Sequence, residues 1–179
     1  MFNNLFDIRG KIALVTGGSR GIGEMIAAGF LANGAKVYIS SRKADACAAT
    51  AERLQAAYGG ECIAIPANLA DVEGCQQLAD TLSAREPRLD ILINNAGITK
   101  DTLLMRMKDE DWDTVISTNL TSVYKLSQHV IKSMMKERYG RIINITSVVG
   151  HMGNAGQTNY AATKAGIDGF TKSLAQEIG

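Results

Sequence analysis

Short apolar runs alternate along the chain with longer segments in which apolar residues recur every three or four positions. The apolar runs predict buried strands, and the longer segments predict amphipathic helices. The predicted strands cover 11–16, 35–40, 61–66, 89–94 and 140–146, and the predicted helices cover 21–33, 43–58, 71–85, 109–136 and 159–179. Because this alternation is typical of βαβ units, we predict an α/β fold with a doubly wound, Rossmann-like parallel sheet.

Residues 1–179 contain no linker or low-complexity segment, so the pattern predicts a single domain. Folds of this kind usually carry another strand after a helix such as 159–179. Without one, the predicted strand at 140–146 would be an uncovered apolar edge, and we interpret the domain as incomplete at its C-terminus. The acidic residues Asp109, Glu110, Asp111 and Asp113 are expected near a helix N-terminus, where they complement the helix dipole, and we assign them no catalytic role.

Composition excludes several classes of protein. Hydrophobic residues make up 46% of the chain and charged residues 21%, which is ordinary for a globular protein, and the net charge of +1 predicts neither a nucleic-acid partner nor a membrane partner. Cys47, Cys62 and Cys75 have no spacing typical of a zinc site, so reduced thiols are expected. His129 and His151 have no metal-ligand spacing either, and we expect no metal. The start, MFNNLFDIRGK, lacks a secretory signal pattern, which predicts a soluble, cytoplasmic protein.

A glycine-rich turn joins the first predicted strand to the first predicted helix. The segment VTGGSRGIGEMIA has glycines at 17, 18, 21 and 23. Glycines there allow a pyrophosphate to approach backbone N–H groups at the helix N-terminus, although a tight strand–helix turn alone also requires them. Their position in a βαβ unit favours a dinucleotide site.

The spacing Gly-x-x-x-Gly-x-Gly resembles that of the short-chain dehydrogenase/reductase family, and NNAG at 94–97 matches a second motif of that family. The resemblance implies that Asn68 contacts adenine and that NNAG lines the cofactor site. The implied cofactor-binding residues are Gly17, Ser19, Arg20, Gly21, Ile22, Gly23, Ser41, Arg42, Asn68, Leu69, Asn95, Ala96, Gly97, Tyr160 and Lys164.

The end of the second predicted strand bears on the choice of cofactor. A site for NAD usually places a carboxylate there to bind the ribose 2′-hydroxyl, but this sequence has ISSRK. Arg20 and Arg42 are suited to a 2′-phosphate, although either arginine alone is as readily explained as a solvated side chain. Together with the missing acid they favour NADP(H).

Tyr160 and Lys164 are four residues apart at the start of the last predicted helix, so their side chains share one face. This pair alone is weak evidence, because packing also explains it. With Asn119 and Ser147, however, it matches the family's Asn-Ser-Tyr-Lys tetrad in order and spacing. Reduction of a ketone requires a proton for the developing alkoxide, and an ammonium group near a phenol makes it a better proton donor and acceptor.

These considerations assign Tyr160 as the general acid, Lys164 as the group that tunes it, and Ser147 as a hydrogen-bond donor to the substrate oxygen. The resemblance further implies that Asn119 holds a water linked to Lys164.

The segments NNAGITKDTLLMRMKDEDWDTVISTNL and GRIINITSVVGHMGNAGQTNYAATKAG look most like bacterial 3-oxoacyl-[acyl-carrier-protein] reductases. That resemblance implies NADPH-dependent reduction of a 3-oxoacyl thioester, on acyl carrier protein or CoA, to the 3-hydroxyacyl form in fatty-acid synthesis. ITKDTLLMRM and VVGHMGNAGQT would border the substrate. The resemblance also implies a homotetramer for a full-length protein, and we expect little turnover from 179 residues alone. Two alternatives stay open: another enzyme of the family acting on acetoacetyl-CoA, a sugar or a steroid, and an NADP-binding module without turnover.

Overall fold

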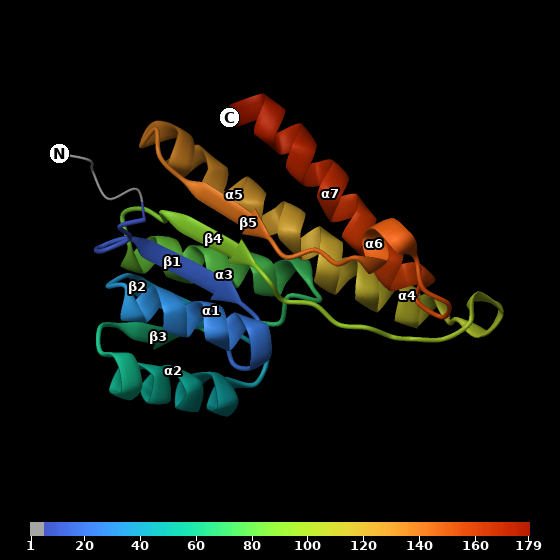
Figure 1. The fold of residues 1–179 in the computed structure, drawn as a ribbon, viewed down its shortest axis with the longest axis horizontal. Coiled ribbons are helices and arrows are strands. Elements are labelled where there is room, and N and C mark those ends of the chain that lie inside the picture. Colours follow the sequence, from blue (N-terminus) through green and yellow to red (C-terminus); the bar gives the residue numbers. More distant parts are fainter. Residues whose placement is uncertain (1–5) are drawn as a thin grey trace.

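The computed structural model describes residues 6–179, in which strands and helices alternate as predicted (Figure 1). The strands are β1 (Ile12–Thr16), β2 (Lys36–Ser40), β3 (Cys62–Ala64), β4 (Ile91–Asn94) and β5 (Arg141–Asn144). All neighbouring strands pair in parallel, in the order β3-β2-β1-β4-β5. This order reverses at β1, as in a doubly wound sheet, and the predicted fold class is confirmed. The expectation of no secretory signal rests partly on residues 1–5, which lie outside the described residues.

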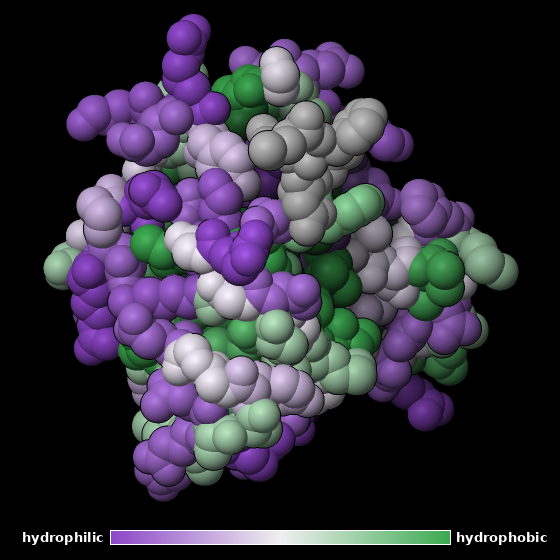
Figure 2. All heavy atoms as spheres, turned by 60° about the vertical axis from the view of Figure 1, so that its left-hand side comes forward, coloured by the Kyte–Doolittle hydropathy of each residue, from purple (hydrophilic) through white to green (hydrophobic). Residues whose placement is uncertain are grey.

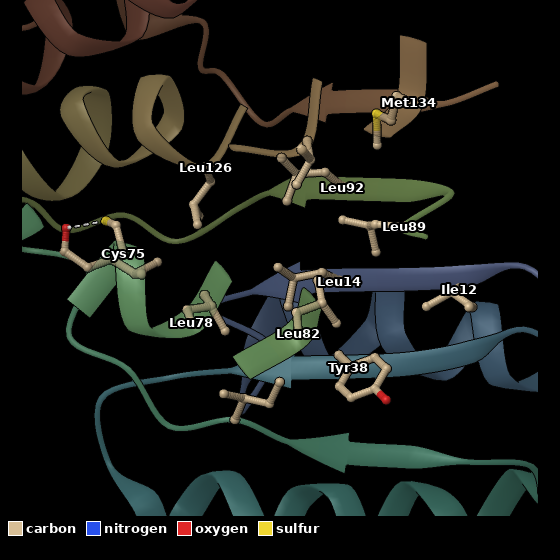
Figure 3. Packing of buried hydrophobic residues seen from close by; sticks show 13 residues of the cluster. Ile12, Leu14, Tyr38, Cys75, Leu78, Leu82, Leu89, Leu92, Leu126 and Met134 are labelled. Atoms are coloured by element: carbon tan, nitrogen blue, oxygen red, sulfur yellow. Dashed lines mark hydrogen bonds between the residues drawn. The ribbon is translucent and has the colours of Figure 1, made fainter. Parts of the chain in front are cut away.

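The helices cover both faces of the sheet. They are α1 (Gly21–Ala32), α2 (Ala44–Tyr58), α3 (Val72–Arg85), α4 (Asp109–Ile116), α5 (Ser122–Lys136), α6 (Val149–Met152) and α7 (Thr158–Ile178). Leu14 and Leu92 of the sheet pack with Leu78 of α3 and Leu126 of α5 (Figure 3). On the opposite face a second cluster joins the sheet to α1 and α2; its fully buried members include Val15, Val37, Ile39, Ala27 and Cys47. Buried strands between two helical layers read as continuous apolar runs, which is why the sequence identified them.

The helical stretch predicted over 109–136 is confirmed, but it is not one regular α-helix. It consists of α4, a π-helical turn η2 (Ser117–Thr121) and α5, so the regular hydrogen-bond ladder is interrupted. The apolar spacing continues through the turn without a Gly or Pro, and therefore carried no sign of it. The sequence also gave no indication of the short 3₁₀ helix η1 (Leu104–Arg106) or of α6.

β5 is the edge of the described sheet and Ile143 is half exposed, as expected for an uncovered strand. Asp109, Glu110 and Asp111 lie in the first turn of α4, as predicted, whereas Asp113 lies further along it. The strands fall up to two residues short of their predicted limits at either end, a common error at element boundaries.

The three cysteines are buried and free of disulfides, and burial raises the pKa of the Cys62 and Cys75 thiols to about 11. On the face drawn in Figure 2, hydrophilic residues predominate and hydrophobic ones appear among them. No helix in the described part of the chain is both long enough and apolar enough to cross a membrane.

Candidate active site

The glycine turn between β1 and α1 has a conformation that only glycine accommodates. Gly17 has φ +66°, a backbone conformation that side chains disfavour. A Cβ at Gly23 would lie 2.3 Å from the Gly17 carbonyl oxygen, so the first turn of α1 approaches the loop too closely for any side chain. The loop thus exposes backbone at the N-terminus of α1, the geometry that binds phosphate groups.

Asn95, immediately after β4, holds this loop in place. Its Nδ2 donates to the Thr16 carbonyl oxygen at 2.9 Å. The Thr16 hydroxyl donates to the Ile93 carbonyl oxygen and accepts from the backbone N–H groups of Asn95 and Ala96, both at 3.0 Å. The ends of β1 and β4 are therefore locked together by side chains. Nothing near Thr16 in the sequence indicates this role, since its partners lie nearly 80 residues away.

A cavity of about 360 Å³ opens beside the glycine turn, at the ends of β1, β2 and β4. Most of the predicted cofactor residues line it: Gly17, Ser19, Arg20, Gly21, Ile22, Gly23, Ser41, Arg42, Leu69, Asn95, Ala96 and Gly97. Ser40, Ala67, Ile98 and Thr118 also line it, and sequence reasoning did not assign them. The hydroxyl oxygens of Ser40 and Thr118 are buried without a hydrogen-bond partner among the described residues. Two unpartnered hydroxyls in one cavity wall are a feature expected of a site for a polar ligand.

Asn68 does not line this cavity, although its neighbours Ala67 and Leu69 do. Its exposed side chain donates to Asp71 at 2.8 Å and accepts from the backbone N–H of Ala70 at 3.3 Å. The adenine contact implied for Asn68 stays a prediction.

Asn119 lies in the π-helical turn η2 and is completely buried. Its Oδ1 accepts from the Ile98 backbone N–H at 2.8 Å, and its Nδ2 donates to the Ile98 carbonyl oxygen at 2.9 Å. A longer contact of 3.4 Å joins Nδ2 to the Thr163 hydroxyl on α7. Asn119 therefore anchors the segment after β4. This bracing role differs from the water-holding role implied by the resemblance. The π-helical turn itself is a feature that is frequent at functional sites.

Lys164 is a buried cation beside Tyr160. Its side chain is 4% exposed, its Nζ donates to the Ile145 carbonyl oxygen at 2.7 Å, and Nζ lies 5.6 Å from the centre of the Tyr160 ring. Burial lowers the pKa of Lys164, and the charge of Asp168 partly opposes that effect. The Cβ position of Gly97 would lie 3.9 Å from Nζ and 3.5 Å from Asn119 Oδ1. The side chains of Lys164 and Asn119 therefore both approach Gly97, which lines the cavity.

Ser147 lies in the segment between β5 and α6. Its hydroxyl oxygen accepts from the Val149 backbone N–H at 3.2 Å, which leaves the hydroxyl proton available to another acceptor. The adjacent Thr146 hydroxyl donates to the Lys164 carbonyl oxygen at 3.2 Å. The Ser147 segment is therefore tied to the first turns of α7, which carry Tyr160 and Lys164.

Asn159 and Thr163 are buried members of this site that sequence reasoning missed. Asn159 Nδ2 donates to the Lys100 carbonyl oxygen at 3.2 Å, and its Oδ1 accepts from the Tyr160 N–H at 2.7 Å. The Thr163 hydroxyl donates to the Tyr160 carbonyl oxygen at 2.7 Å. Asn159 stands next to Tyr160 in the sequence, which was the only available hint. The described residues contain no cluster of three His, Cys, Asp or Glu side chains placed to hold a metal ion.

Comparison with known proteins identifies clear relatives. A family model described as short chain dehydrogenase matches residues 11–179. The chain is 52% identical over 172 residues to the 3-oxoacyl-[acyl-carrier-protein] reductase FabG of Vibrio harveyi, a match that covers 96% of this chain and 69% of that protein. It is 50% identical over 174 residues to nodulation protein G of Rhizobium sp. strain N33, covering 97% and 69%. Among solved structures, the Pseudomonas aeruginosa RhlG/NADP active-site complex has a TM-score of 0.88 and 44% identity, over 96% of this chain and 68% of that one.

Proposed function

Because the chain belongs to the short-chain dehydrogenase family, we propose that it reduces 3-oxoacyl thioesters to 3-hydroxyacyl thioesters with NADPH, as a step of fatty-acid synthesis. The observation that carries the proposal is the buried Lys164 ammonium beside the Tyr160 ring, next to a cavity with a glycine-turn wall. The reductases of Vibrio harveyi and Escherichia coli, each about half identical to this chain, are named for that reaction on acyl carrier protein.

The residues of the cavity fit NADP(H). Gly17 and Gly23 let the turn pack closely at the start of α1, where backbone N–H groups suit a pyrophosphate, and the unpartnered hydroxyls of Ser40 and Thr118 suit a polar ligand. None of the described residues that line the cavity is acidic, and the exposed guanidinium groups of Arg20 and Arg42 favour a 2′-phosphate over a 2′-hydroxyl. RhlG, a structural relative, was solved as an NADP complex.

When bound, NADPH supplies the hydride that reduces the carbonyl carbon. Tyr160 donates its hydroxyl proton to the carbonyl oxygen, so that hydride and proton together convert the ketone into an alcohol. The positive charge of Lys164, near the Tyr160 ring, stabilises the phenolate that remains. The Ser147 hydroxyl donates a hydrogen bond to the same substrate oxygen as negative charge develops on it. Asn119 keeps the Ile98 segment in place between the cavity and α7.

Exposed apolar side chains on two segments near the site support an acyl substrate. Leu104, Met105, Val148 and Met152 are all more than half exposed. A backbone hydrogen bond joins the two segments that carry them: the Thr102 N–H donates to the Gly156 carbonyl oxygen at 2.8 Å. These are the segments expected to border the substrate. The proposal extends to acyl carrier protein as the carrier, to a cytoplasmic location, and to a homotetramer as the assembly.

The test is single-turnover oxidation of NADPH, monitored with the protein at stoichiometric concentration. Acetoacetyl thioesters should oxidise NADPH, and a panel of sugar and steroid ketones should not. Oxidation by a sugar or steroid alone would support another activity of the family. NADPH binding without oxidation by any substrate would support a nucleotide-binding module and would contradict the proposal.

A further inference from the structure

Asp168 lies one helical turn after Lys164 on α7, so the two side chains share a face of that helix. Its Oδ2 atom is buried and accepts no hydrogen bond from any described residue. The same oxygen lies 3.2 Å from Nε2 of His151 on α6, within ion-pair distance but without hydrogen-bond geometry. A buried carboxylate oxygen is costly unless a positive charge faces it, and His151 provides one when its ring is protonated.

Helix α6 connects this contact to Ser147, which precedes it by two residues. The Gly150 N–H donates to the Ser147 carbonyl oxygen at 3.0 Å. A Cβ at Gly150 would lie 2.9 Å from the Ala165 backbone nitrogen, so α6 and α7 pack backbone against backbone (Figure 1). His151 and Asp168 add a charged contact to this joint, which holds the Ser147 segment against the helix that carries Tyr160 and Lys164.

Asp168 also acts on Lys164 through its charge. Burial lowers the pKa of Lys164, and Asp168 is the charged group that opposes this effect. The elements that pack most closely against α7 are α6, η2 and α4. Helix α6 carries His151, and the turn η2 carries no titratable side chain. Strand β5 also reaches α7, through a hydrogen bond from Asn144 to Thr171. The acidic residues of α4 are Asp109, Glu110, Asp111 and Asp113, of which Asp111 pairs with Lys100 at 3.4 Å. On α7 itself, Lys172 follows Asp168 by one turn and is exposed.

We propose that Asp168 is a positioning residue of this site: it fastens α6 to α7 through His151, and it places a negative charge one helical turn after Lys164. The proposal rests on the proposed function only in that Lys164 is assigned there to the reaction.

The experiment is an NMR titration of the Lys164 side chain in the 179-residue protein, without cofactor or substrate. Asp168→Asn should lower the pKa of Lys164, because the opposing charge is removed and burial remains. Asp168→Glu keeps the negative charge and should therefore leave the pKa of Lys164 close to that of the unaltered protein. Asp80→Asn is the matched control, since it removes the same charge from an exposed site on α3 and should leave Lys164 unchanged.

His151→Gln tests the fastening separately. It should leave the Lys164 titration nearly unchanged. Hydrogen exchange at the Gly150 and Met152 amides, which donate to backbone carbonyl oxygens, should accelerate by about two- to fivefold, the worth of an ion pair with one exposed partner. An unchanged Lys164 titration in Asp168→Asn would overturn the electrostatic role, and unchanged exchange in His151→Gln would overturn the fastening. Because neither measurement involves NADPH, the Asp168 proposal can fail while the reductase proposal stands, and the reverse.

Discussion

Replacing Asn119 with alanine should destabilise the whole domain. The change removes two hydrogen bonds to the Ile98 backbone, at 2.8 and 2.9 Å, and the longer contact to Thr163. Each bond contributes about 1 kcal/mol net, and backbone groups left without partners add to the loss, so the free energy of unfolding should fall by about 2–4 kcal/mol. In a chain of this size, that loss lowers the melting temperature by roughly 5–15 °C.

The assay is thermal unfolding followed by circular dichroism, with Asn33→Ala as the control. Asn33 also makes a side-chain hydrogen bond, to the Gly29 carbonyl oxygen at 2.8 Å, but at an exposed helix end. Its loss should cost no more than about 0.5 kcal/mol. If Asn119→Ala melted at the same temperature as this control, the anchoring role of Asn119 would be refuted, and a role confined to holding water would be favoured.

Three further predictions concern the cofactor cavity and acid stability. Gly23→Ala should abolish measurable NADPH binding in calorimetry, because its Cβ would strike the Gly17 carbonyl oxygen at 2.3 Å; unchanged affinity would contradict the close approach. Arg42→Ala should weaken NADPH binding about tenfold and leave NADH binding unchanged, the loss expected for one charge-assisted contact to a phosphate. Burial raises the pKa of Glu86, but hydrogen bonds from Lys36 and Tyr38 outweigh it and hold that pKa below its usual value of 4.5. The stability that this depressed pKa provides is present above about pH 4.5 and is lost as the pH falls through the lower pKa of the folded state. The urea midpoints of unfolding at about pH 6 and about pH 3 should therefore differ less in Glu86→Gln than in the unaltered protein.

The sheet could be predicted because buried parallel strands are continuous apolar runs, and amphipathic helices repeat every 3.6 residues. The glycine turn was recognisable because the spacing of Gly17, Gly21 and Gly23 is itself the signal. By contrast, the π-helical turn around Asn119 left no mark, since the apolar spacing continues through it.

The supporting contacts of the site were also beyond reach of the sequence. Thr16, Asn159 and Thr163 bond to partners brought near by the fold, or to the backbone. Apart from the place of Asn159 next to Tyr160, nothing in their local sequence distinguishes them from ordinary polar residues. The deep burial of Lys164 was equally unexpected, because lysine is rarely buried unless an oxygen accepts a hydrogen bond from its ammonium group. The Ile145 carbonyl oxygen does so here.

The most direct test of the reductase proposal compares Tyr160→Phe with Tyr58→Phe in single-turnover oxidation of NADPH by an acetoacetyl thioester. Tyr58 is half exposed at the end of α2, so the control removes the same hydroxyl group away from the site. At saturating NADPH, the proposal predicts that Tyr160→Phe loses at least about a hundredfold in rate, while Tyr58→Phe retains its rate. A Tyr160→Phe protein that oxidises NADPH as fast as the control would contradict it.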